Sequence, residues 1–515
     1  MHKQIKPYHL VLFVILLFAF IIRIFPRLLL PYFYIDDETI NMVIPILKMI
    51  HAHSLDPHFY KYGTLIHYLT VPIYEIYFHI KHISPLPPPS LDFMIPTLYY
   101  IGRYESAVFD ILTILVTYKI GERLFNKKVA FLALIFMTFN PLQIYMSHVF
   151  KPDTFMTFFA MCVFYYSIRI KEENKLKWYV LAGVFSGFAM STRLDIFVLL
   201  MPITGWFICN YKIHVPDSTR RQNIRNIAVF LLVAFVAFFL TSPYLVLHIP
   251  EFLHKIFHEF SNEQHVNLVN DIYHKKFIAQ FIVVFPFILS ISVYLLSIFG
   301  IFLYAKSKGL YETLFYFIYP FVYFLIVTIL SDRPSYTWYS YFYLVVLPFF
   351  ILIASYSFIY IWDKINNNGM KVLIAMIVFI DILSASGSFV SSIYNYDRAG
   401  YWVNKEIAPN SSILILTTFR PVFKWKYYVY PLYTESIKET PPLEYIIKVV
   451  NPDIVIASGF DISLRGGYKY FKNIMKDDHF HQVKIIMPKY APYVDLFSPF
   501  LYDVRIGKIY IYKNH

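Results

Sequence analysis

Long apolar runs separated by short charged segments recur along most of the chain. They cover residues 10–22, 97–118, 129–146, 155–168, 178–190, 196–209, 227–247, 277–305, 313–330, 338–361 and 372–390. A helix of about 20 apolar residues crosses the hydrocarbon core of a bilayer. Only 15% of the residues are charged, whereas soluble domains carry roughly 25%. The sequence therefore predicts a polytopic α-helical membrane protein with about eleven transmembrane helices. Cys162 and Cys209 fall inside these runs and are expected to be packed thiols, not a disulfide or a metal site.

The basic residues predict how these helices are oriented. With a cytoplasmic N-terminus and alternating spans, the segments on the inside hold 18 Lys and Arg in 58 residues, and those on the outside hold 9 in 115. This bias is the positive-inside pattern of multi-pass membrane proteins. The net charge of +13 is therefore explained by orientation and does not indicate a nucleic-acid partner. We expect a plasma-membrane protein in contact with the lipid bilayer.

Three features divide the chain. A long first outer loop, residues 31–93, contains amphipathic stretches typical of interfacial helices. The two short runs around residues 191–195 predict a hairpin whose tip lies at membrane depth. We expect residues 1–390 to form the transmembrane domain and residues 391–515 an extracytoplasmic α/β domain. In that tail, residues 399–407 and 442–450 are expected to be helical, and residues 412–418, 453–458, 482–488 and 504–513 to form strands.

Three consecutive acids, Asp36, Asp37 and Glu38, begin the first outer loop. Ionised carboxylates at a membrane edge are costly, so they are functional-site candidates. The other polar candidates also fall on the outer side: Lys61, Tyr62, Arg103, Glu105, His148, Lys151, Asp153, Arg193, Asp195, Asp332, Arg333, Tyr336, Trp338 and Tyr339. Carboxylates and cations on one surface suit a reaction in which a base removes a proton while cations stabilise a leaving anion.

Each of these residues also has a purely structural interpretation. Asp36 alone is best explained as a solvated loop start, and Arg23 and Arg103 as side chains that reach the lipid headgroups. Arg193 and Asp195 would form an ion pair at a helix end. Singly, the structural interpretation is favoured for most candidates. Taken together with the predicted topology, the functional interpretation is favoured.

The order and spacing of several segments resemble a known family over nearly the whole chain. An acidic pair follows the first span, and KYGTL lies in the outer loop just after Pro57. The segments RYESAVFDILTILVTYKIGERLF, FNPLQIYMSHVFKPDTFMTFFAM, LAGVFSGFAMSTRLDIFVLL and YDRAGYWVNKEIAPNSSILI then follow in order. This arrangement resembles the C-type membrane glycosyltransferases, in particular the dolichyl-phosphate-mannose protein mannosyltransferase-like group, glycosyltransferase family 39. Arg193 stands where that group more often carries Lys.

The resemblance implies inverting transfer of a sugar from a polyprenyl-phosphate donor to a protein, lipid or glycan acceptor on the outer face. It implies that Asp37 is the general base and Glu38 its support, with Asp36 as an extra acid. Cations would stabilise the departing lipid phosphate. The candidates for that role, in falling order, are Arg193, Lys61, Arg333 and Arg103.

Further substrate contacts are expected from Tyr62, His148, Lys151, Asp153 and Tyr336. Some relatives in the wider superfamily hold a divalent cation with acids of the first two outer loops. Here Asp37, His148 and Asp153 would approximate such a Mg or Mn site, although the oxygen-rich set that these ions prefer is incomplete.

Two other classes of protein remain open from the sequence. A lipid or solute transporter or flippase would also be polytopic, but transporters place polar groups at a midplane site between repeats, whereas here they gather at one face. A non-catalytic membrane assembly factor would bind partners through its outer tail and would tolerate Asp37→Asn.

Overall fold

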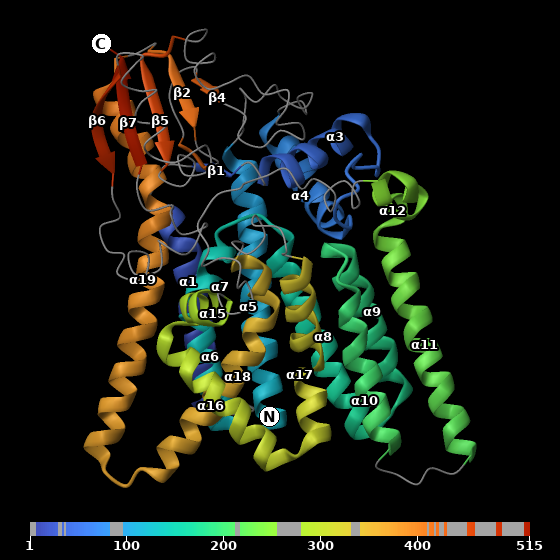
Figure 1. Cartoon of the computed structure of the whole chain (residues 1–515). Coiled ribbons are helices and arrows are strands. Elements are labelled where there is room, and N and C mark those ends of the chain that lie inside the picture. The colour runs from blue at the N-terminus through green and yellow to red at the C-terminus, as the bar shows by residue number, and fades with distance from the viewer. Residues whose placement is uncertain are drawn as a thin grey trace, which may run out of the picture.

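The computed structural model (Figure 1) describes residues 7–28, 33–35, 38–82, 96–211, 217–254, 280–330, 340–408, 411–416, 419–421, 427–429, 451–458, 480–486 and 509–514. Each of the eleven apolar runs coincides with helical structure. The corresponding helices are α1 (Pro7–Leu28), α5 (Pro96–Leu124), α6 (Lys127–Thr138) with α7 (Pro141–Ser147), α8 (Pro152–Glu173), α9 (Leu176–Arg193), η2 (Ile196–Leu199) with α10 (Leu200–Tyr211), α11 (Asp217–Thr241) with α12 (Pro243–Leu247), η4 (Gln280–Val284) and α15 (Phe285–Leu289) with α16 (Ile291–Lys308), α17 (Leu310–Leu330), η5 (Ser340–Val346) with α18 (Leu347–Lys364), and α19 (Asn368–Glu406).

Among the described residues, five helices are long and apolar enough to cross a membrane, and the bent pair α6–α7 would be a sixth. Helices such as α5 are not counted among these five because they carry charged residues along their length and are less apolar. In α5 two of these, Arg103 and Asp110, are buried in the protein. A polytopic helical membrane protein was therefore correctly predicted, and the polar residues within its helices are sheltered by neighbouring helices.

The first outer loop folds into η1 (Thr39–Val43), α3 (Ile44–Ala52) and α4 (Leu65–Lys81). Figure 1 shows α3, α4, α12 and the β-sheet at one end of the helix bundle. The α16–α17 and α18–α19 connections lie at the opposite end. The elements expected on the outer side are therefore on one side of the bundle.

The tail forms a five-stranded mixed sheet in the order β4 (Tyr427–Val429), β2 (Ile413–Leu416), β5 (Ile454–Ser458), β7 (Ile509–Asn514), β6 (Phe480–Ile486). Strand β2 is parallel to both β4 and β5, whereas β7 is antiparallel to β5 and β6. A strand therefore overlaps each of the four predicted segments, although β6 begins before residue 482 and β7 ends after residue 513. The helix expected at residues 442–450 lies outside the described residues. The boundary expected at residue 391 falls within α19, which continues from the span into the tail.

A separate two-stranded sheet joins the tail to a segment near the N-terminus. Strand β1 (Phe33–Ile35) pairs antiparallel with β3 (Phe419–Pro421), with Tyr34 opposite Arg420. The tail is thus connected directly to the segment that leads into the first outer loop.

Aromatic rings fill the interior of the bundle. Phe164 of α8 packs against Phe315 of α17 and Phe349 of α18, with ring centroids 5.5 and 4.8 Å apart. Both cysteines, Cys162 and Cys209, are buried free thiols, as predicted. Such packing fixes α8, which carries several of the candidate residues at its outer end.

His67 ties α4 to the start of the outer loop. Its ring is buried, and Nε2 lies 2.9 Å from the carbonyl oxygen of Asn41. Burial lowers the pKa of His67 to about 4, although the contact with the Asn41 carbonyl opposes this shift. The folded outer loop therefore holds this imidazole in its neutral form.

Acid is accordingly expected to destabilise the outer loop. Because the folded pKa of His67 is below the unfolded value of about 6.5, its contribution is complete above pH 6.5 and is lost as the pH falls to 4. The loss amounts to about 3 kcal/mol of unfolding free energy. Unfolding of the detergent-solubilised protein followed from pH 7 to pH 4 measures it. The variant His67→Gln keeps a hydrogen-bond donor but does not titrate, so its unfolding free energy should fall less steeply between pH 7 and pH 4. An equally steep fall in the variant and in wild type would contradict the assignment of this effect to His67.

Candidate active site

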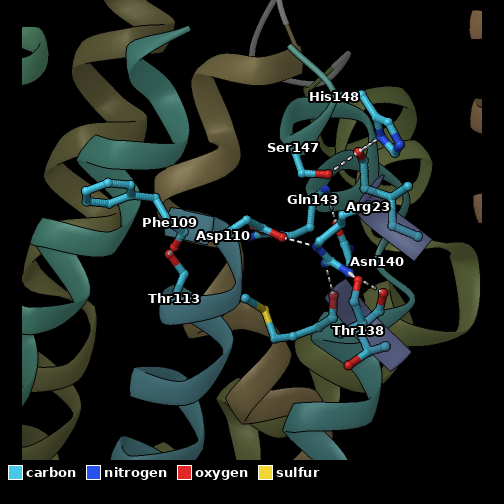
Figure 2. A network of polar contacts seen from close by, with 12 residues as sticks. Arg23, Phe109, Asp110, Thr113, Thr138, Asn140, Gln143, Ser147 and His148 are labelled. Atoms are coloured by element: carbon cyan, nitrogen blue, oxygen red, sulfur yellow. Dashed lines mark hydrogen bonds and ion pairs between the residues drawn. The ribbon is translucent and has the colours of Figure 1, made fainter. Parts of the chain in front are cut away.

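A break between α6 and α7 leads the chain into the candidate site (Figure 2). The two helices are bent by 56° at residues 139–140. Asn140 caps α7 by accepting a hydrogen bond from Gln143 N–H at 3.0 Å, and its amide donates to the carbonyl of Ile288 at 2.9 Å. Helix α7 then ends at the outer turn that carries His148, Lys151 and Asp153.

Arg23 of α1 stabilises this break. Its guanidinium is ion-paired with Asp110 of α5, and both residues are buried. It also donates to the carbonyls of Thr138 and Met137 at the end of α6, at 3.2 and 3.3 Å. The Thr138 carbonyl is at the last residue of α6, where carbonyls lack an intrahelical donor, and a lost hydrogen bond is costly within the membrane. The Met137 carbonyl also accepts from the backbone N–H of Asn140, at 3.3 Å. Interpreting Arg23 as a residue that reaches the lipid headgroups is therefore wrong.

Glu38 anchors the start of the outer loop. Its carboxylate is fully buried and ion-paired with Arg103, which donates through Nε at 2.7 Å. It also accepts a hydrogen bond from the backbone N–H of Phe150 at 2.6 Å. A Cβ on Gly102 would lie 2.2 Å from the Phe150 ring, so glycine is required for this approach. Arg103 is thus a buried partner of the acidic segment and does not reach the headgroups.

Two cations gather on aromatic rings beside this anchor. Lys151 Nζ lies 3.7 Å from the ring centroid of Tyr341, at the start of η5. Arg193 Cζ lies 4.3 Å from the ring centroid of Phe342 and 5.7 Å from that of Tyr341. Asp153 is ion-paired with Arg193. Among the described residues, Asp153 thus holds Arg193, and both cations lie against rings at the start of η5.

The pairing of Arg193 with Asp195 is corrected by the structure. Asp195 instead accepts hydrogen bonds from the Tyr319 hydroxyl and from the backbone N–H of Phe197, where it caps η2. Leu194 adopts a left-handed backbone with φ of 59°, which ends α9 and separates the two side chains. Arg193 is thereby directed to Asp153, which comes from a different outer turn.

The KYGTL segment docks on the same end of α9. A Cβ on Gly63 would lie 2.1 Å from the carbonyl oxygen of Ser191, so only glycine permits this contact. Thr64 N–H donates to Ser242 Oγ at 2.9 Å, which ties the segment to the junction of α11 and α12. Lys61 and Tyr62 therefore belong to a segment that touches α9 two residues before Arg193.

The described residues do not assemble the cation site considered from the sequence. Asp153 is engaged by Arg193, and Nδ1 of His148 contacts the Ile144 carbonyl at 2.6 Å. Among the residues that the structure describes, no three His, Cys, Asp or Glu side chains gather as a metal-binding group. Asp37, the third proposed ligand, lies outside the described residues.

The structure thus brings together Glu38, Arg103, Lys151, Asp153 and Arg193, and connects Lys61 and Tyr62 to them through Gly63. Asp36, Asp37, Arg333 and Tyr336 lie outside the described residues. Tyr341 and Phe342 were not predicted, although they follow directly on the aromatic loop that contains Tyr336. The density of aromatic residues in SYTWYSYFYL was the available signal.

Part of the chain matches the profile of a known family. The sequence profile of the family described as dolichyl-phosphate-mannose-protein mannosyltransferase matches residues 100–247. This stretch contains Arg103, the outer turn of Lys151 and Asp153, and Arg193. Comparison with curated proteins returned no match.

Solved structures match the chain over almost its full length. ArnT from Cupriavidus metallidurans in the apo state superposes with a TM-score of 0.51 and 11% identity, covering 98% of this chain and 97% of ArnT. ArnT bound to undecaprenyl phosphate gives a TM-score of 0.50 at the same identity and coverage. AglB from Archaeoglobus fulgidus, in complex with an inhibitory peptide and a dolichol-phosphate, gives 0.51 and 11% identity, covering 94% of this chain and 74% of AglB. The chain therefore has the fold of the C-type membrane glycosyltransferases, and the resemblance inferred from its sequence is confirmed at that level.

Proposed function

We propose that the protein is a membrane glycosyltransferase that transfers a sugar, with inversion, from a polyprenyl-phosphate donor to an acceptor hydroxyl on the outer face. The observation that carries this proposal is the placement of Lys151 and Arg193 on Tyr341 and Phe342, beside the anchored Glu38. Two fixed cations next to an acidic segment suit the departure of an anionic leaving group.

The donor phosphate would lie against Lys151 and Arg193. Its charge increases as the bond between the anomeric carbon and the phosphate oxygen breaks, so fixed cations stabilise the transition state more than the ground state. Asp153 holds the Arg193 guanidinium in place and neutralises part of its charge. The lipid tail accounts for a site at the end of a membrane bundle. ArnT bound to undecaprenyl phosphate and AglB with a dolichol-phosphate support a polyprenyl carrier.

Asp37 would act as the general base. It precedes Glu38, which is fixed by Arg103 and by the backbone of Phe150. The carboxylate takes the acceptor proton as the acceptor oxygen attacks the anomeric carbon, and the lipid phosphate leaves with the bonding electrons. The family profile and the AglB complex support a mannosyl donor and a protein acceptor as the first substrates to examine.

The purified full-length protein, given a panel of polyprenyl-phosphate sugars and a mixture of peptide, lipid and glycan acceptors, tests this function. We expect release of free polyprenyl phosphate together with a glycosylated acceptor for at least one donor. Arg193→Ala should abolish release by removing the principal cation. Transbilayer movement of lipid or solute without any sugar transfer, or no turnover of any donor, would refute the proposal.

A further inference from the structure

Asp195 is a buried carboxylate beside the site, and the proposed reaction does not use it. One of its oxygens caps η2 by accepting from the backbone N–H of Phe197 at 3.0 Å. The other oxygen accepts from the hydroxyl of Tyr319 in α17, at 2.5 Å. Among the described residues, each carboxylate oxygen thus has one donor. Loss of the Tyr319 hydroxyl would leave one oxygen of a buried acid without a donor, which is costly.

Arg193 and Asp195 carry opposite charges two residues apart, yet they have different partners. Arg193 is ion-paired with Asp153 and lies against the ring of Phe342. Between the two charges, Leu194 has a φ of 59°, a conformation that is costly for a residue with a Cβ. Such a turn persists only where the surrounding contacts hold it. The separation of the two charges therefore depends on their neighbours.

Two tyrosines of α17 provide contacts on either side of this turn. Tyr319 and Tyr323 are four residues apart, so they lie on the same face of the helix, and their ring centroids are 5.8 Å apart. Tyr319 donates to Asp195, and the phenol of Tyr323 interacts with the Arg193 guanidinium. Helix α17 also packs against η2 and η5. One helix face thus engages both charged residues that flank Leu194.

We propose that Tyr319 is a positioning residue of the active site, which holds Asp195 and so prevents this carboxylate from capturing Arg193. This inference rests on the proposed function, in which Arg193 stabilises the departing phosphate. Without the phenol hydroxyl, the guanidinium two residues away would supply the missing donor, because hydrogen bonds between charged groups are the stronger ones. Arg193 would then be drawn away from Asp153 and from the donor. A misplacement of about 1 Å at such a group lowers turnover by up to about 100-fold.

The variant Tyr319→Phe removes only this hydroxyl. With the purified full-length protein and a polyprenyl-phosphate sugar that wild type turns over, we expect kcat/KM for the donor to fall at least about 10-fold, with the acceptor KM within about 2-fold. The matched control is Tyr316→Phe in the same helix, whose hydroxyl donates to the carbonyl of Phe349 at 2.8 Å. Both tyrosines are fully buried. The control loses a comparable hydrogen bond, and its donor kinetics should stay within about 2-fold of wild type.

Adding Asp195→Asn to Tyr319→Phe should restore kcat/KM for the donor to within about 3-fold of wild type, because the amide has no charge with which to attract Arg193. Asparagine also keeps the cap of η2. A second loss in a buried network ordinarily adds to the damage, so recovery distinguishes capture of Arg193 from a structural defect. Normal donor kinetics in Tyr319→Phe, an equal loss in Tyr316→Phe, or no recovery in the double variant would overturn the inference.

A double-mutant cycle on stability tests the same point without turnover. The unfolding free energies of Arg193→Gln, Asp195→Asn and their combination should show little coupling in the wild-type background and clear coupling in the Tyr319→Phe background. Equal coupling in the two backgrounds would contradict the role given to Tyr319. If wild type turns over no donor, the proposed function fails, and the cycle still decides whether Tyr319 keeps the two charges apart.

Discussion

Asp37→Asn is expected to lower kcat for sugar transfer by about 100- to 10,000-fold, the range for loss of a positioned general base. The amide has nearly the shape of the carboxylate but does not accept the acceptor proton. Donor binding should change little, because in the proposed mechanism the phosphate lies against Lys151 and Arg193 and does not contact Asp37. Single-turnover transfer and donor affinity, measured separately on the purified protein, distinguish the two effects.

The matched control is Asp36→Asn, which removes the same charge one residue earlier. We expect its kcat to stay within about 5-fold of wild type, well short of the loss assigned to the base. Normal turnover by Asp37→Asn would exclude it as the base. If Asp36→Asn showed the large loss and Asp37→Asn did not, the base would instead be Asp36.

The second large effect is expected on stability, at the Arg23–Asp110 pair. Removing one partner of a buried ion pair leaves an uncompensated charge and typically costs 3 to 5 kcal/mol, so Asp110→Leu should lower the unfolding free energy by about that amount. Arg23→Leu should cost a similar amount, because it leaves Asp110 as the uncompensated charge and also removes the Arg23 donor from the Thr138 carbonyl. Chemical unfolding in detergent micelles measures both variants.

The double variant Arg23→Leu/Asp110→Leu should be less damaging than the sum of the two single variants, since it leaves no unpaired charge. It should still be less stable than wild type, because the Thr138 carbonyl at the break has lost its Arg23 donor. Arg123→Leu is the matched control. Its ion pair with Glu172 is about one third exposed, so about 1 kcal/mol at most is expected. This interpretation would be contradicted if the double variant lost the sum of the two single losses in unfolding free energy. It would also be contradicted if Arg23→Leu and Arg123→Leu lowered the unfolding free energy equally.

The helices were predictable because hydrophobic runs report burial in lipid directly. The tail strands were predictable from short apolar segments such as Ile413–Leu416 and Ile454–Ser458. The break between α6 and α7 was not predicted. Its local signal was Asn140–Pro141, an N-cap followed by proline in the first turn of α7. The contacts of Arg23 with carbonyls 114 and 115 residues away have no such local signal.

In the candidate site too, contacts between residues far apart in the sequence were not predictable. The sequence placed Glu38, Arg103, Lys151, Asp153 and Arg193 on one face, but it gave the wrong partner for Arg193. Proximity in sequence favoured Asp195, whereas the left-handed turn at Leu194 and the packing of α8 beside α9 bring Asp153 to the guanidinium. Tyr341 and Phe342 were missed for the same reason, since an aromatic ring becomes part of a site only through tertiary contacts.

Helix α19 has a mechanical consequence. Its 39 residues extend about 58 Å, roughly twice the thickness of the hydrocarbon core. The outer portion thus works as a spacer that fixes the height of the β-sheet above the bilayer surface. Each residue inserted there would lift the sheet by about 1.5 Å and rotate it by about 100°. The separation between the β-sheet and the helix bundle is therefore set in part by the length of this helix.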